Sequence, residues 1–217
     1  MSHHSIAEDN TSLFERVHIG GGAHYSITNF DVHIDADELD RAESEIIDNK
    51  NDSSWGGYVQ AGKNWQVSDS WVLGGVIDYH HLNTSKDVWD NASDYADMDA
   101  DYLMSVRGKA GYLINPRTLV YGTAGLARYK AKLHASDNSN RYYGSKSFSN
   151  NMAVIGAGVN WFTSYSDNLS FQLELLHYYG GGREQFREDE LTNDMDNGDF
   201  ARIRQNTALN FGINYHF

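Results

Sequence analysis

The sequence predicts an all-β fold: an eight-stranded antiparallel up-and-down transmembrane β-barrel with short periplasmic turns and four long extracellular loops. Segments of about ten residues, the length of a membrane-spanning strand, alternate apolar and polar side chains. The connections alternate short and long, and aromatic residues gather near both ends of the segments. Because side chains two apart on a strand share a face, each segment has one lipid-facing side and one lumen-facing side.

Composition agrees with a barrel without requiring one. The 217 residues carry a net charge of −13 and 40% hydrophobic residues, and their mean hydropathy of −0.60 also suits a soluble acidic domain. The chain has no cysteine and one proline, which excludes disulfides and cysteine metal sites. No apolar run reaches the ~18 residues of a spanning helix.

The first three segments set an apolar, lipid-facing side against a polar, lumen-facing side. In the first, the lipid-facing residues are Val17, Ile19, Ala23, Tyr25 and Ile27, and the lumen-facing ones are Arg16, His18, His24, Ser26 and Thr28. In the second, Val59, Ala61 and Trp65 face lipid, and Tyr58, Gln60, Asn64 and Gln66 face the lumen. In the third, Trp71, Leu73, Ile77 and Tyr79 face lipid, and Asp78 and His80 face the lumen.

The next five segments follow the same rule. The fourth opposes Tyr102, Met104, Val106, Ala110, Tyr112 and Ile114 to Ser105, Arg107 and Lys109, and the fifth opposes Leu119, Tyr121, Ala127, Tyr129 and Leu133 to Arg128, Lys130 and Lys132. The sixth directs Ala153, Ile155, Ala157, Val159 and Trp161 outward, and the seventh opposes Leu169, Phe171, Leu173, Leu175 and Tyr179 to Gln172 and Glu174. The eighth, from about Phe200, opposes Leu209, Phe211, Ile213, Tyr215 and Phe217 to Asn206, Asn210, Asn214 and His216.

The connections and aromatic residues define the two ends of the barrel. Residues 68–70, 115–116 and 164–168 form tight turns, whereas 31–54, 84–98, 134–147 and 181–199 are long and polar. Two aromatic belts are predicted, one near the turns and one near the long loops: Trp65, Trp71, Tyr112, Trp161, Tyr215 and Phe217; and Tyr25, Tyr79, Tyr102, Tyr129 and Tyr179. Residues 13–217 are expected to form one barrel domain, preceded by a flexible segment, residues 1–12, from which a signal peptide has been removed.

Several strings resemble a known family. They are residues 62–66 (GKNWQ), 71–76 (WVLGGV), 106–112 (VRGKAGY), 118–127 (TLVYGTAGLA) and 156–159 (GAGV), and the C-terminal phenylalanine. In these the chain resembles the small opacity-type outer-membrane β-barrels of Gram-negative bacteria, the porin family proteins, which are similar in architecture to the barrel of outer-membrane protein A.

The resemblance implies a bacterial outer-membrane location, surface-exposed loops and a terminal strand that the barrel-assembly machinery reads. The insertion signal would be Phe211, Ile213, Tyr215 and Phe217. Expected partners are outer-membrane lipid and lipopolysaccharide, the barrel-assembly machinery and a protein or cell-surface partner of the loops. Nucleic acid, cofactors and metals are not expected.

Charged residues on the lumen side predict a salt-bridge network that fills the barrel. They are Asp78, Asp99, Asp101, Arg107, Lys109, Arg128, Lys130, Lys132, Glu174, Arg202 and Arg204. If Asn115 and Pro116 are the central residues of their turn, opposed residues of the fourth and fifth strands sum to 231. This register sets Asp101 opposite Lys130, Asp99 opposite Lys132, both pairs lumenal, and Tyr102 beside Tyr129 on the lipid side.

The long loops are acidic. Residues 31–54 hold nine acids and two bases, residues 84–101 six and one, and residues 181–199 seven and two, so nearly all the negative charge is external. The function predicted from these loops is a non-enzymatic, structural and surface-interaction (adhesin-like) role, through divalent cations that bridge to lipopolysaccharide phosphates or through a basic partner.

Two other functions remain open. The lumenal bases could line a narrow channel for small anions. A lipid A-modifying enzyme would need a serine near a histidine, and the candidates are Ser145, Ser147 or Ser149 with His177.

Overall fold

Eight long strands account for most of the protein in the computed structural model, which describes residues 13–34, 46–90, 94–137, 143–180, 184–185 and 200–217. The strands are β1 (Val17–Ile34), β2 (Ile46–Gln66), β3 (Trp71–Asp90), β4 (Asp94–Asn115), β5 (Thr118–Asp137), β6 (Tyr143–Phe162), β7 (Leu169–Tyr179) and β9 (Phe200–His216). A two-residue strand, β8 (Glu184–Gln185), pairs only with β9. The described part of the chain contains no helix long and apolar enough to cross a membrane.

The eight long strands close into a barrel, which confirms the predicted fold class. Each strand pairs antiparallel with the next, and β9 returns to pair with β1. The stagger of the barrel can be counted by following paired residues from strand to strand, starting at Ile19 on β1. The path runs through Ala61, Ile77, Val106, Leu126, Ala153, Tyr179 and Gln205 and returns to β1 at Asn29, ten residues beyond Ile19. This shift of ten residues is the stagger that closure of tilted strands requires.

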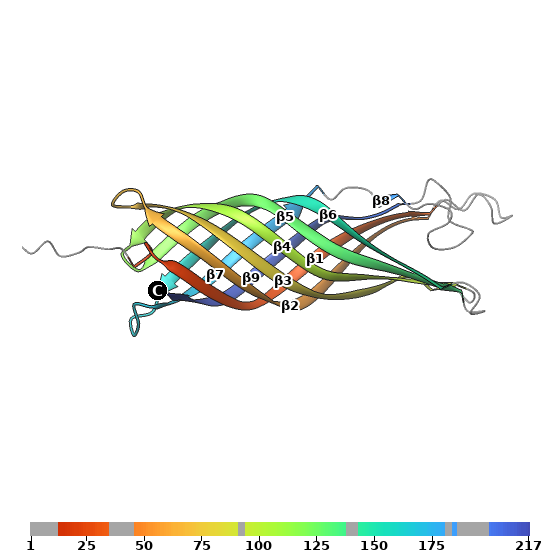
Figure 1. The fold of residues 1–217 in the computed structure, drawn as a ribbon, viewed down its shortest axis with the longest axis horizontal. Helices are drawn as coiled ribbons and strands as arrows, with labels where there is room; N and C mark the ends of the chain where they lie inside the picture. The colour runs from red at the N-terminus through yellow and green to blue at the C-terminus, as the bar shows by residue number, and fades with distance from the viewer. Residues whose placement is uncertain (1–12, 35–45, 91–93, 138–142, 181–183, 186–199) are drawn as a thin grey trace, which may run out of the picture.

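The strands extend much further at one end of the barrel than at the other (Figure 1). At the turn end, where the C-terminus lies, short connections join β2 to β3, β4 to β5 and β6 to β7. At the opposite end, called the loop end here, the strands continue far beyond the closed barrel. β1 to β6 are 18 to 22 residues long, about twice what a membrane-spanning strand needs.

Three of the predicted long loops, 31–54, 84–98 and 134–147, therefore include long stretches of strand. Segments 31–34 and 46–54 extend β1 and β2, and segments 84–90 and 94–98 extend β3 and β4. Outside a membrane a strand needs no apolar face, because backbone hydrogen bonds alone define its pairing. Period-two hydrophobicity thus reports only the part of each strand that faces lipid.

The predicted faces are wrong for β5. Tyr121 and Tyr129 are 3% and 0% exposed and face the lumen with Ala127, whereas Val120 and Leu126 are 45% and 70% exposed. Apolar residues stand next to each other here, so both parities present an apolar side. A tyrosine can face the lumen when its hydroxyl has a polar partner, and Tyr121 Oη donates to Glu174 Oε1 at 2.9 Å.

The predicted turn between β4 and β5 is displaced by one residue. Pro116 and Arg117, rather than Asn115 and Pro116, lie between the paired residues Asn115 and Thr118. A register irregularity between Leu113 and Asn115 follows the turn, so that Tyr102 lies opposite Lys130, and the predicted Asp101–Lys130 and Tyr102–Tyr129 pairs are wrong.

A β-bulge near Ala100 then restores the predicted register towards the loop end. Asp99 does pair with Lys132 along the backbone, as predicted. The ion pair that forms is Asp101 Oδ2 to Lys132 Nζ at 3.2 Å, and it lies outside the lumen because buried Ala131 fixes Lys132 on the outer side.

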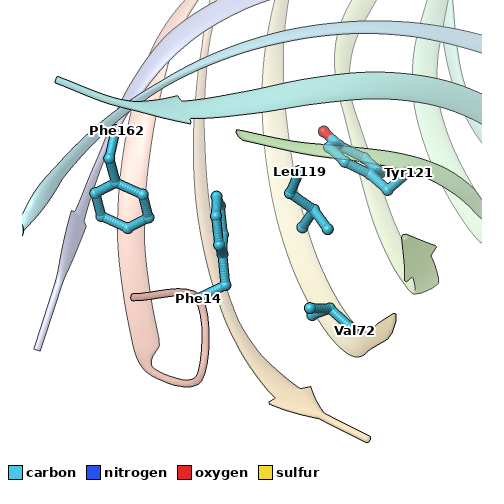
Figure 2. Close-up of a cluster of buried hydrophobic side chains, with 5 residues drawn as sticks. All are labelled: Phe14, Val72, Leu119, Tyr121 and Phe162. Atoms are coloured by element: carbon cyan, nitrogen blue, oxygen red, sulfur yellow. The ribbon is translucent and has the colours of Figure 1, made fainter. Parts of the chain in front are cut away.

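A hydrophobic plug closes the turn end. The chain before β1 folds into the barrel, where fully buried Phe14 packs with Val72, Leu119, Tyr121 and Phe162 (Figure 2). The Phe14 and Phe162 rings meet edge to face at 4.9 Å between centroids. Sequence patterns missed this plug because Phe14 precedes the first alternating segment.

Phe14→Ala is expected to lower the free energy of unfolding by about 3 kcal/mol, because it leaves a cavity against Phe162 and Leu119. Phe14→Leu keeps most of the volume and is expected to cost less than about 1.5 kcal/mol. Urea unfolding of the barrel in lipid vesicles, followed by tryptophan fluorescence, measures both. Equal stability of wild type and Phe14→Ala would show that the plug contributes nothing.

Candidate functional site

A buried ion network crosses the middle of the lumen. Arg107 on β4 donates from Nη2 to Asp78 Oδ2 on β3 at 2.6 Å and from Nε to the same oxygen at 3.0 Å. On its other side, Arg107 Nη1 donates to Glu174 Oε1 on β7 at 2.9 Å. All three charged side chains are fully enclosed. One guanidinium therefore joins two carboxylates from opposite sides of the barrel.

Further polar groups complete this network. Ser105 Oγ donates to the Asp78 carboxylate at 2.7 Å, and His80 Nε2 lies 3.2 Å from Asp78 Oδ1. Tyr121 supplies a second donor to Glu174. Enclosed charges are tolerated only when such partners replace the lost water, so the network depends on all of these contacts together.

Lys109 adds a fourth buried charge beside the network. Its ammonium nitrogen lies 4.6 Å from the centroid of the Tyr121 ring, a cation–π contact. This nitrogen has no hydrogen-bond partner among the described residues. The charged side chains that are buried in the described lumen, Asp78, Glu174, Arg107 and Lys109, thus balance in sign.

Polar side chains fill the lumen around the network. Gln60 Nε2 donates to Gln172 Oε1 and to Asn214 Oδ1, both at 2.6 Å, and Asn214 Nδ2 donates to Gln172 Oε1 at 2.9 Å. Nearer the turn end, Ser170 Oγ and His216 Nε2 share a hydrogen bond of 2.8 Å. Gly158 leaves room for this filling, since a Cβ there would lie 2.6 Å from the Tyr121 hydroxyl.

Several predicted network residues lie outside the lumen. Arg128 is exposed, and Lys130 and Lys132 point outward with it on the reversed face of β5, while Arg204 on β9 is also exposed. Arg204 falls at the irregularity where the β1 to β9 register shifts. The side chains of Asp99, Leu133 and Arg202, and all of residues 1–12, lie outside the described part of the chain.

The outer surface carries most of the predicted aromatic residues. Trp71 meets Tyr112 at 5.5 Å near the turn end, and Tyr79 stacks on Tyr102 at 5.6 Å towards the loop end. Trp65, Trp161, Tyr25 and Tyr179 also point outward, as do the proposed insertion-signal residues Phe211, Ile213, Tyr215 and Phe217. Tyr129 is the exception, because it is buried. Trp55, which the sequence analysis missed, is 69% exposed and contacts Tyr25 at 5.2 Å.

The candidate serine–histidine pair does not form. His177 Nδ1 shares a hydrogen bond of 2.9 Å with Thr207 Oγ1 and pairs across the sheet with Ile155. Ser149 lies six residues from Ile155, about 20 Å along β6, and Ser147 lies further still. Among the described residues, no group of three or more His, Asp or Glu side chains could hold a metal ion.

The sequence matches the family model of the outer membrane protein β-barrel domain over residues 5–217. The chain belongs to this outer-membrane β-barrel family. It is 27% identical to the 31 kDa outer-membrane immunogenic protein of Brucella melitensis over 188 residues, 82% of this chain and 74% of that protein. In fold it is similar to the outer membrane protein OprG of Pseudomonas aeruginosa, with 12% identity, a TM-score of 0.51 and coverage of 95% of this chain and 100% of that one.

Family membership confirms the bacterial outer-membrane location. In such barrels the short turns are periplasmic and the long connections are external. The Phe14 plug therefore closes the periplasmic mouth, and the long strand extensions project from the cell.

Removing Arg107 alone is expected to cost about 3–5 kcal/mol of unfolding free energy, because Asp78 and Glu174 would remain buried without their cation. Asp78→Asn/Arg107→Leu/Lys109→Met/Glu174→Gln removes all four of the buried lumenal charges described above, so most of that loss should be recovered. Urea titration of the three barrels in vesicles measures both differences. A quadruple variant less stable than Arg107→Leu would contradict this explanation.

Proposed function

We propose that this protein is a non-enzymatic surface-interaction barrel that binds its partner through the external extensions of its strands. The observation that carries the proposal is the length of β1 to β6, 18 to 22 residues, when about ten suffice to cross the membrane. The surplus forms paired strands beyond the external aromatic belt. Such paired strands give a firmer binding platform than unpaired loops.

The charge of these extensions indicates the chemistry of the partner. Residues 30–50, which include the loop-end parts of β1 and β2, carry eight acids and two bases. Residues 133–146, which include the loop-end parts of β5 and β6, carry one acid and two bases. A basic partner, or one bridged by divalent cations, would therefore meet the β1–β2 hairpin more favourably than the β5–β6 hairpin.

The filled lumen favours this function over a channel. The periplasmic mouth holds the Phe14 cluster, and the middle holds the Arg107 network and the Gln60 layer. With Arg128, Lys130 and Lys132 outside the lumen, the basic excess expected of an anion path is missing from the described interior. The name of the Brucella relative, an immunogenic outer-membrane protein, supports exposure at the cell surface.

Purified protein in planar bilayers is expected to give no steady current in 1 M KCl, because side chains occupy the lumen at several levels. A general porin added to the same bilayer serves as the positive control. A steady, anion-selective current from the purified barrel would favour the channel function instead.

Shortening the acidic hairpin is expected to abolish adhesion of expressing cells to an epithelial monolayer. Because Asn29 pairs with Asn51, residues 30–50 can be replaced by an Asn-Gly turn without changing the register. The matched control replaces residues 133–146 between the paired Lys132 and Ser147 in the same way, and should keep adhesion.

Folding of both shortened barrels is checked by their heat-modifiable migration on a detergent gel. Adhesion of wild type should weaken as NaCl is raised from low to high concentration, since exposed charges are screened. Equal adhesion of the two shortened proteins would contradict a role for the acidic hairpin.

A further inference from the structure

Two cations project from the barrel wall near the external aromatic belt. Arg128 is exposed and Lys130 is partly exposed, and both alternate with fully buried Tyr129 and Ala131, so they point away from the lumen. Lys130 pairs across the sheet with Tyr102, a member of that belt. Belt aromatics lie at the level of the lipid headgroups, so these two cations face the headgroups of the outer leaflet.

These two charges lack an ion-pair partner in the part of the chain that the structure describes. Neither Arg128 nor Lys130 forms an ion pair with another residue that the structure describes. Arg128 Nη2 donates one hydrogen bond, to Ser149 Oγ at 2.7 Å. The next cation on the strand, Lys132, is already paired with Asp101. Arg128 and Lys130 are thus available to an external anion.

A groove of about 800 Å³ runs across the outer surface directly below Arg128. Its walls are apolar and include Val59, Ile77, Tyr79, Met104, Val106 and Leu126. From β1 towards β9, successive paired residues lie nearer the loop end, by ten residues in one full circuit. The groove therefore rises towards the loop end from β2 to β5. Arg128 therefore lies at its upper, external end, where an acyl chain would join its headgroup.

We propose that this groove and its two cations bind a phosphorylated, acylated glycolipid of the outer leaflet, the lipid A part of lipopolysaccharide. An acyl chain lies in the apolar groove, and a lipid A phosphate accepts hydrogen bonds from Arg128 and Lys130. The planar guanidinium matches phosphate oxygens in pairs, and the ammonium adds a point charge. This site faces lipid and is separate from the surface of the proposed partner.

The site is tested by titrating the folded barrel, in zwitterionic detergent, with bisphosphorylated lipid A and measuring occupancy by native mass spectrometry. Near an anionic surface each basic residue contributes roughly fivefold in affinity, so Arg128→Gln/Lys130→Gln should weaken binding about 25-fold. Lys63→Gln is the matched control, because Lys63 is also exposed on the outer wall but lies near Trp65 at the periplasmic end. It should bind as wild type does.

Two further arms separate the headgroup from the chain. Ala61→Phe fills the groove from the lipid-facing side, and should weaken lipid A binding while the barrel stays folded by its gel shift. Lipid A without phosphates, and the deacylated phosphosugar alone, should each bind more weakly than intact lipid A. Unchanged binding by Arg128→Gln/Lys130→Gln, equal loss in Lys63→Gln, or equal binding of the dephosphorylated lipid would each overturn the proposal.

Discussion

The rest of this structure depends on one constraint: inside a membrane, lipid offers no hydrogen-bond partner to a backbone N–H or C=O group. The sheet satisfies this by closing, since β9 pairs with β1 and leaves no edge within the membrane. Eight strands with a stagger of ten residues leave an interior just wide enough for side chains. Every lumenal residue must therefore fit beside its neighbours, and glycine at position 158 is one result, because Tyr121 occupies the adjacent space.

Closure also decides how the lumen handles charge. The narrow interior cannot hydrate ions freely, so the buried charges are matched: Asp78 and Glu174 against Arg107, with Lys109 close by. A buried network of this kind is weak evidence for added stability, because desolvation offsets much of the attraction. Its clearer effect is geometric, since Arg107 links β4 not only to its neighbour β3 but also to β7, a strand with which β4 shares no backbone pairing.

The sequence was sufficient to predict the barrel because lipid-facing positions must be apolar and lumenal ones need not be. That rule assigns the faces of seven strands and identifies Asp78, Arg107 and Glu174 as lumenal. It fails for β5, where Val120 stands beside Tyr121 and Leu126 beside Ala127, so that the pattern has no preferred parity. A one-residue register irregularity between Leu113 and Asn115 gives β5 the opposite parity to the predicted one, which places Arg128, Lys130 and Lys132 on the outer wall. The sequence pattern did not indicate Phe14 or the strand extensions for a different reason. Neither has a lipid-facing side, so neither produces an alternation of apolar and polar residues.

The reversed face of β5 separates its cations from the charges of the lumen. The charges that are buried in the described lumen balance in sign, and Arg128 and Lys130, outside the lumen, lie near the external belt. This arrangement is favourable in a leaflet whose headgroups are anionic, because cations at the level of the phosphates attract the lipid while acids at that level would be repelled. Were the faces of β5 as the sequence pattern suggested, the same cations would face a lumen that holds two carboxylates, and their charge would be unpaired in a narrow interior. The energetics of the lumen and of the lipid surface therefore favour the same parity for this strand.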